Sequence, residues 1–347
     1  MKAILIKQFV SDLADLQVSD IAPPKQDKSK IQVQITHAAV THVDQLYAQG
    51  LHQNNKRHIK PPFILGNEFS GIVTESNPLS PFKPGDRVFG GALGAYAEHA
   101  NVSADTLRTV PQAWSNLQAC AVGSSGAISY GALISVAGLR RGECVLILGA
   151  SGGLGVMAIQ IAKAVGARVI AVVGGEDKAD MVRKIGADEV VSYRDVDWEE
   201  SVRGKTAGGD GVEVVYDAVD QLTERVGMVR SALKCIKYRG RIVIVGFAAR
   251  EGKMEQVAMN RVLLKGAAIY GYRFGEDGRR DPRRVVDAWE GFMRLVDCGK
   301  VGPVVYERSY DGLGEVARAL LDVREHKTWG RAVVKVRSEG EQSKVKL

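Results

Sequence analysis

The stretch "LILGASGGLGVMAIQIA", Leu146–Ala162, decides the fold. Its apolar run ends at Leu148, glycines follow at GxxGxxG spacing, and an apolar helical pattern begins directly after them. Such glycines permit a tight turn and let backbone N–H groups approach a pyrophosphate at the positive end of the helix. A plain strand-to-helix turn is the alternative. Because the stretch opens a repeated series of strands and helices, we expect it to bind a dinucleotide.

The series consists of apolar strands that alternate with amphipathic helices. Strands are expected in "CVLILGA", "ARVIAVVGG", "DEVVSY", "GVEVVYDAV", "GRIVIVGFA" and "AAIYGYRF", and one of the helices in "LTERVGMVRSALKCI". Buried strands joined by helices are the signature of a parallel, doubly wound sheet with both faces covered. The predicted fold class is therefore α/β.

Residues 1 to about 115 follow another pattern, of short strands and turns, as in "KIQVQITHAAV" and "PFKPGDRVFG". Near Leu117 the pattern changes to "ACAVGSSGAISYGALISVA", which predicts a helix rich in small residues. We expect a β-rich domain over residues 1–118 and a dinucleotide-binding domain over residues 119–299. Residues from about 300 to 347 complete the first domain, because the last strand, in "GRAVVKV", returns to it.

Composition limits the partners. The 347 residues suffice for two domains. The net charge of +7 permits an anionic partner, but the chain has no nucleic-acid motif and only 6% aromatic residues. Four widely spaced cysteines indicate a reducing compartment, the cytoplasm. No apolar stretch matches a signal peptide or a membrane span, so neither membrane nor nucleic acid is an expected partner.

The end of the second strand decides the choice of cofactor. An NAD site needs an acidic residue there for the ribose hydroxyls, and this chain has Gly174. Lys178 follows at a distance from which it can pair with a 2′-phosphate, whereas Glu176 argues for the unphosphorylated ribose. The balance favours NADPH.

Taken together, these motifs identify a family resemblance. The chain resembles the medium-chain dehydrogenase/reductase superfamily over nearly its whole length, and most of all the zinc-independent quinone oxidoreductase branch with its ζ-crystallin-like proteins. The matching motifs are "GNEFSGIV" (66–73), "FKPGDRVFG" (82–90), "AYAEHANV" (95–102), "GASGGLGVMAIQIAKAVGARVIAVVGGEDK" (149–178), "GADEVVSYRD" (186–195) and "GVEVVYDAV" (211–219).

The resemblance implies a GroES-like substrate domain, a Rossmann-like cofactor domain and a site between them, in a homodimer or homotetramer. It implies that the backbone of Ser151–Leu154 holds the pyrophosphate and that Gly174, Lys178 and Tyr193 surround the 2′-phosphate. Gly246 and Phe247 line the nicotinamide pocket. The expected cofactor residues are Asp44, Ser151, Gly152, Gly153, Leu154, Gly174, Lys178, Tyr193, Gly246, Phe247 and Arg331. For Asp44 we expect above all a capping role in the turn "THVD".

The same resemblance bears on metal and substrate. Zinc alcohol dehydrogenases of the superfamily carry cysteine where Thr41 stands and histidine where Asn67 stands, and a catalytic zinc needs three protein ligands. We expect no zinc. Members often have asparagine at the position of Thr41, and a threonine near the nicotinamide where this chain has Ile128. These departures put a standard quinone site in doubt.

Without a Lewis acid, reduction of an electron-poor acceptor is the favoured chemistry. We expect a small electrophilic substrate, a quinone or an α,β-unsaturated carbonyl. His42 and Tyr47 are the candidate catalytic residues, and His52 and Tyr130 the candidate substrate residues. Each has a structural alternative: the tyrosines as amphipathic core residues and His52 as an exposed residue of the loop "LHQNNKRHIKPP". A pathway-specific enoyl reductase and a non-catalytic NADPH-binding sensor or structural protein remain alternatives.

Overall fold

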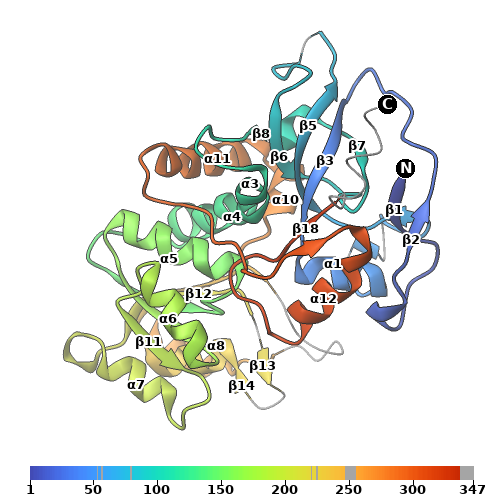
Figure 1. Cartoon of the computed structure of the whole chain (residues 1–347). Helices are drawn as coiled ribbons and strands as arrows, with labels where there is room; N and C mark the ends of the chain where they lie inside the picture. The colour runs from blue at the N-terminus through green and yellow to red at the C-terminus, as the bar shows by residue number, and fades with distance from the viewer. Residues whose placement is uncertain are drawn as a thin grey trace. The chain divides into compact units, whose positions relative to one another are not determined.

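The computed structural model in Figure 1 describes residues 1–52, 54–55, 58–78, 80–219, 221–223, 226–246 and 255–336. The chain divides into two compact units. The terminal unit is Met1–Ser124 with Pro303–Leu347, and the central unit is Ser125–Gly302. The boundary expected after residue 118 falls inside helix α3 (Asn116–Val122), which packs against strands of the terminal unit and so belongs to it.

The central unit contains a six-stranded parallel sheet, which confirms the predicted doubly wound arrangement. The strands, in spatial order, are β11 (Glu189–Ser192), β10 (Arg168–Val173), β9 (Cys144–Leu148), β12 (Val212–Asp217), β15 (Ile236–Ile244) and β16 (Ala268–Gly271). The chain runs outward from β9 in one direction and from β12 in the other. The switch point therefore lies beside β9, the strand that precedes the glycine loop, and such points are where doubly wound sheets bind ligands.

Helices accompany this sheet, and α5 and α6 both pack against strand β10 (Figure 1). Their bounds are α4 (Ser125–Tyr130), α5 (Gly153–Val165), α6 (Glu176–Lys184), α7 (Trp198–Gly204), α8 (Met228–Cys235), α9 (Met259–Lys265), α10 (Phe274–Arg280) and α11 (Pro282–Asp297). A π-helical turn, Gly131–Val136, follows α4. Apolar side chains of strands β9, β10, β12 and β15 form a core with those of α7 and α8.

The helix predicted in "LTERVGMVRSALKCI" is wrong in its first part. Strands β13 (Gln221–Thr223) and β14 (Val226–Gly227) pair with each other there, and α8 begins only at Met228. The Glu255 carboxylate accepts hydrogen bonds from the backbone N–H groups of Val229 and Arg230, at 3.0 and 2.7 Å. An acceptor from a distant segment thus fixes the start of this helix, which local sequence does not reveal.

The terminal unit is built on antiparallel strands. One sheet contains β2 (Val18–Asp20), β1 (Lys2–Ile6) and β4 (Phe63–Ile64). The larger sheet contains β17 (Tyr310–Asp311), β18 (Val333–Lys335), β3 (Ile31–Ala39), β5 (Glu68–Glu75), β6 (Arg87–Gly91) and β8 (Leu107–Thr109), with β7 (His99–Val102) also paired to β3. The last strand, β18, pairs antiparallel with β3, as expected. Helices α1 (His42–Gln49) and α12 (Val316–Arg324) lie side by side.

The segment Asn116–Val136 corrects two expectations. It is not one helix, because Gly123 adopts a φ of 47° between α3 and α4. Its 21 residues are also long and apolar enough to cross a membrane, although no stretch of that length was expected. Of the most apolar part of this segment, 67% is buried inside the fold, a burial that core helices show as well.

Candidate functional site

The glycine loop leaves no room for side chains at two of its positions. Gly149 has a φ of +67°, and a Cβ atom there would lie 2.4 Å from Val219. A Cβ atom on Gly155 would lie 2.3 Å from the carbonyl oxygen of Gly149 and 2.6 Å from backbone atoms of Ala150. These contacts are shorter than atoms permit, so glycine is required at both positions.

The same loop leads into the first turn of helix α5. Gly152 is the N-cap residue of α5 and provides no side-chain hydrogen bond to the first turn. Ser151, Gly153 and Leu154 are half-buried and Gly152 is exposed. The first N–H groups of a helix have no partner within it, and the helix dipole favours an anion there. The four predicted loop residues therefore lie together in a geometry that fits a pyrophosphate.

A buried hydrogen-bond chain holds this helix start from behind. The Tyr216 hydroxyl lies 2.9 Å from the Ser129 hydroxyl, and the Ser129 hydroxyl donates to the carbonyl oxygen of Leu154 at 3.0 Å. Because Ser129 has a single proton to give, Tyr216 is the donor in the first contact. Ser129 and Tyr216 are fully buried. The chain joins β12 and α4 to the first turn of α5, and sequence patterns gave no sign of it.

The predicted 2′-phosphate residues cluster after β10 and β11. A Cβ atom on Gly174 would lie 2.3 Å from the hydroxyl oxygen of Tyr193, so these two residues touch. Lys178 is half-buried, and its pKa is lowered, first by burial and also by the positive charge of Arg194, while Asp177 raises it. Arg194 is thus a second cation close to Lys178, and the sequence analysis missed it.

Glu176, which argued for an unphosphorylated ribose, has a partner elsewhere. Its carboxylate is exposed and pairs with Arg183 along α6, at 3.2 Å. Gly246 follows the end of β15, and a Cβ atom there would lie 3.3 Å from the carbonyl oxygen of Ala218. Phe247 lies outside the described residues. Tyr130 packs with its ring against Gly291 of α11, where a Cβ atom would lie 2.3 Å from it. A substrate role for Tyr130 stays a prediction.

In the terminal unit, Asp44 lies at the centre of a network of donors. Thr41 and Asp44 form the capping box of α1, as the turn "THVD" predicted. One carboxylate oxygen of Asp44 accepts from the backbone and hydroxyl of Thr41, at 2.8 and 2.7 Å, and from the hydroxyl of Tyr96, at 2.9 Å. The other accepts from the amide of Asn67, at 2.6 Å. Burial raises the pKa of Asp44, and these hydrogen bonds oppose that rise.

Both oxygens of Asp44 are thus occupied by protein donors. A direct bond from Asp44 to a cofactor stays a prediction, and the observed contacts give it a capping and anchoring role. Asn67 contributes a donor to this buried carboxylate. Removal of one donor from such a group costs on the order of 1–3 kcal/mol.

The predicted Arg331 lies in a second buried pair. Its guanidinium is 3.4 Å from the Glu68 carboxylate, and the two side chains are 10% and 11% exposed. The other oxygen of Glu68 accepts from the backbone N–H of Ser124, at 3.0 Å. A Cβ atom on Gly123 would lie 2.5 Å from Glu68. The pair therefore ties the C-terminal segment of the chain to β5 and to the residues after α3.

The candidate catalytic residues His42 and Tyr47 lie on α1, and the candidate substrate residue His52 follows it. His42 is the first residue of α1 and half-buried, and Tyr47 is 7% exposed. The ring of His52 stacks on that of Tyr47, with centroids 4.3 Å apart. The structure thus brings Tyr47 and His52 together.

Comparisons with known proteins agree with this architecture. The family model "Alcohol dehydrogenase GroES-like domain" matches residues 27–112, and "Zinc-binding dehydrogenase" matches residues 153–291. Quinone oxidoreductase 1 of Escherichia coli is 31% identical, over 92% of this chain and 95% of that protein. A solved structure of Escherichia coli quinone oxidoreductase complexed with NADPH is 28% identical and has a TM-score of 0.84, covering 96% of this chain and all of that one.

The chain belongs to the quinone oxidoreductases of the medium-chain dehydrogenase/reductase superfamily. This oxidoreductase therefore has the expected GroES-like and Rossmann-like folds. A further relative is the mycocerosic acid synthase-like polyketide synthase of Mycobacterium tuberculosis, 30% identical over 96% of this chain but only 15% of that much longer protein.

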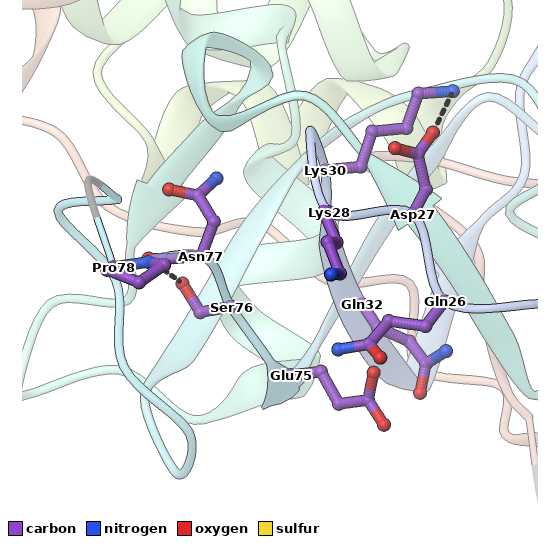
Figure 2. Close-up of a pocket in the computed structure, with 9 residues that line it drawn as sticks. All are labelled: Gln26, Asp27, Lys28, Lys30, Gln32, Glu75, Ser76, Asn77 and Pro78. Carbon is purple, nitrogen blue, oxygen red and sulfur yellow. Dashed lines mark hydrogen bonds and ion pairs between the residues drawn. The ribbon is translucent and has the colours of Figure 1, made fainter.

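Two further observations complete the description of this oxidoreductase. Among the described residues, no three His, Cys, Asp or Glu side chains gather as a metal site would require. A hollow of about 320 Å³ lies between the segment that leads into β3 and the end of β5 with the residues that follow it, and Figure 2 shows the side chains that line it. Its lining is Gln26, Asp27, Lys28, Lys30, Gln32, Glu75, Ser76, Asn77 and Pro78. None of the predicted site residues is among them.

Proposed function

We propose that this protein is an NADPH-dependent reductase that acts on a quinone or an α,β-unsaturated carbonyl. The observation that carries the proposal is the cluster of Lys178, Arg194 and the Tyr193 hydroxyl beside Gly174. Two cations and a hydroxyl suit a 2′-phosphate, and Gly174 stands where an NAD site carries an acidic residue. The NADPH bound to the Escherichia coli relative supports the same cofactor.

The glycine loop and its helix fit the rest of the cofactor. Gly149 and Gly155 allow the backbone to approach a pyrophosphate, and the first turn of α5 offers it N–H donors. When bound, NADPH supplies the hydride that an electron-poor acceptor needs. The protein's own residues must hold the acceptor and provide a proton to its oxygen.

Tyr47 is the proposed proton donor, with His42 as the alternative. The Tyr47 hydroxyl is held by a hydrogen bond from Asn54, at 2.8 Å, and its ring is fixed by stacking on His52. A positioned phenol contributes about 100-fold or more to such a transfer. Replacement of each candidate by Phe separates them, because only loss of the true donor lowers kcat by that factor.

Turnover with defined acceptors tests the function. NADPH is mixed with 1,2-naphthoquinone or a simple enone, and the absorbance of the reduced nicotinamide is followed. We expect oxidation with at least one acceptor and a much lower rate with NADH. Tight NADPH binding without oxidation by either class would contradict the proposal and favour a sensor or structural role.

An enoyl reductase of one biosynthetic route is the second candidate. Ile128, in α4, cannot hydrogen-bond a carboxamide as threonine does, and the polyketide synthase relative spans nearly this whole chain. This candidate predicts turnover of a thioester-linked enoyl substrate and none of generic quinones. Assay of a crotonyl thioester beside naphthoquinone distinguishes the two.

We further propose a homodimer that forms through the edge of the central sheet. Strand β16 is the edge strand there, and α9 exposes Met259, Leu263 and Leu264 by 71%, 79% and 75%. An open sheet edge beside exposed apolar side chains is suited to a second copy of the chain. Light scattering should give a dimer mass for the wild type and a monomer mass for Leu263→Glu.

A cytoplasmic setting fits the free thiols of Cys120, Cys144, Cys235 and Cys298.

A further inference from the structure

A single residue, Asn54, contacts both aromatic side chains of the proposed substrate side. Its side-chain amide donates to the hydroxyl oxygen of Tyr47, at 2.8 Å. Its backbone N–H donates to Nδ1 of His52, at 3.1 Å. The rings of Tyr47 and His52 stack, with an interplanar angle of 22°. Asn54 therefore fixes the orientation of two candidate site residues at once.

The loop in turn fixes Asn54. The backbone carbonyl oxygen of Asn54 accepts hydrogen bonds from the backbone N–H groups of His58 and Ile59, at 2.7 and 3.0 Å. The next residue, Asn55, donates its backbone N–H to the carbonyl oxygen of His52 at 2.9 Å. These backbone bonds hold Asn54 in place, with its side-chain amide directed to the Tyr47 hydroxyl.

The direction of the two hydrogen bonds from Asn54 determines where the protons of Tyr47 and His52 lie. An amide N–H only donates, so the phenol oxygen of Tyr47 is the acceptor and its own proton is not used in this bond. Nδ1 of His52 is likewise an acceptor, which places the proton of the neutral ring on Nε2. The Tyr47 oxygen and Nδ1 of His52 thus both accept a hydrogen bond from Asn54.

A donor to the phenol oxygen stabilises the phenolate more than the phenol, because hydrogen bonds to a charged oxygen are stronger. The proposed reaction depends on this stabilisation of the phenolate, because Tyr47 gives up its proton in it. The acceptor gains one hydride, which carries two electrons, as NADPH is oxidised to NADP⁺; the acceptor oxygen takes the proton of Tyr47, and water returns a proton to the phenolate. We infer that Asn54 is the positioning residue that prepares Tyr47 to release its proton, an inference that rests on the proposed function.

An isosteric variant tests the direction of the bond. Asn54→Asp retains the size of the side chain, but its carboxylate accepts the Tyr47 proton instead of donating. We expect kcat to fall about tenfold, with a larger solvent deuterium isotope effect and unchanged NADPH affinity. Asn54→Ala should show a smaller loss of the same kind. Thermal melting and NADPH binding of both variants verify that they fold.

A double-mutant cycle with Tyr47→Phe separates this inference from the proposed function. In the Tyr47→Phe background, Asn54→Asp should have no further effect on kcat or on the isotope effect. If Tyr47→Phe lowers kcat while Asn54→Asp alone matches the wild type, the role of Asn54 is overturned and Tyr47 stands. If Tyr47→Phe leaves kcat unchanged, both the donor and the inference are overturned. Equal losses for Asn54→Asp in both backgrounds also overturn it, since they indicate only a structural role.

Discussion

The glycine loop of the central unit and the Asp44 network of the terminal unit are organised in opposite ways. The loop works because side chains are missing: at Gly149 and Gly155 any Cβ atom would strike the backbone or Val219. The network works because side chains are present, and each donor to Asp44 comes from a different place in the sequence. The loop should therefore fail when atoms are added, and the network when atoms are removed or exchanged.

The largest effect is expected from an added methyl group in the loop. Gly155→Ala places a Cβ atom 2.3 Å from the Gly149 oxygen, so the loop must move away from the geometry that we propose binds the pyrophosphate. We expect NADPH affinity to fall about 100-fold or more, measured by calorimetry, a loss of roughly 3 kcal/mol. Gly275→Ala is the matched control, because nothing lies within 4 Å of its Cβ position. Equal affinities for both variants would contradict the account of the loop.

The network should respond to an exchange of atoms without change of size. Asp44→Asn replaces one acceptor oxygen by a donor, which then faces either the Asn67 amide or the Thr41 and Tyr96 donors. We expect the free energy of unfolding to fall by about 3 kcal/mol in denaturant titrations. Asp20→Asn, at an exposed strand position, serves as control and should change it little. A stability equal to wild type would show that the Asp44 carboxylate is not the anchor described.

A smaller and more selective effect is expected at the second cation. Arg194→Ala removes the positive charge beside Lys178. If Arg194 and Lys178 bind the 2′-phosphate as proposed, NADPH affinity should fall about tenfold while NADH affinity stays the same. Parallel fluorescence titrations with both nucleotides measure the ratio. Equal losses for NADPH and NADH would remove Arg194 from the 2′-phosphate site.

The smallest effect is expected from the hydrogen-bond chain that joins Tyr216 and Ser129 to the first turn of α5. Ser129→Ala breaks the link from Tyr216 to Leu154 and leaves the Tyr216 hydroxyl buried without this acceptor. NADPH affinity should fall about fivefold, and binding of adenosine 2′-monophosphate, which does not reach the loop, should be unchanged. Calorimetry with both ligands gives the comparison. Loss of both affinities together would indicate a general defect instead of a shift of α5.

The two regions also differ in how far sequence reveals them. The glycine turn before α5, the alternation of strands and helices and the capping role of Asp44 could be predicted, because each depends on a local sequence pattern. The bond from Asn67 to Asp44 spans 23 positions and that from Tyr96 spans 52. Such partners depend on the packing of distant strands, and no local pattern encodes them.

The sequence also failed to reveal the roles of Ser129 and Arg194, because their partners depend on the fold as well. Ser129 belongs to a segment that looked like a helix of small residues, and only the fold shows that its hydroxyl meets Leu154 and Tyr216. Arg194 follows directly after Tyr193, which the family pattern singled out, but its closeness to Lys178 depends on the register of β10 and β11. A search for basic residues around each predicted phosphate contact is the one sequence signal that would have found it.

Transfer of label from the cofactor tests the central claim most directly. The enzyme is incubated with NADPH that carries deuterium at the transferable position of the nicotinamide, together with an acceptor enone, and the product is analysed by mass spectrometry. The account predicts one deuterium at the β-carbon of the saturated product, and loss of this product in Gly155→Ala at limiting NADPH. A reduced product without deuterium, or transfer at equal rates from labelled NADH, would contradict NADPH-dependent hydride transfer by this protein.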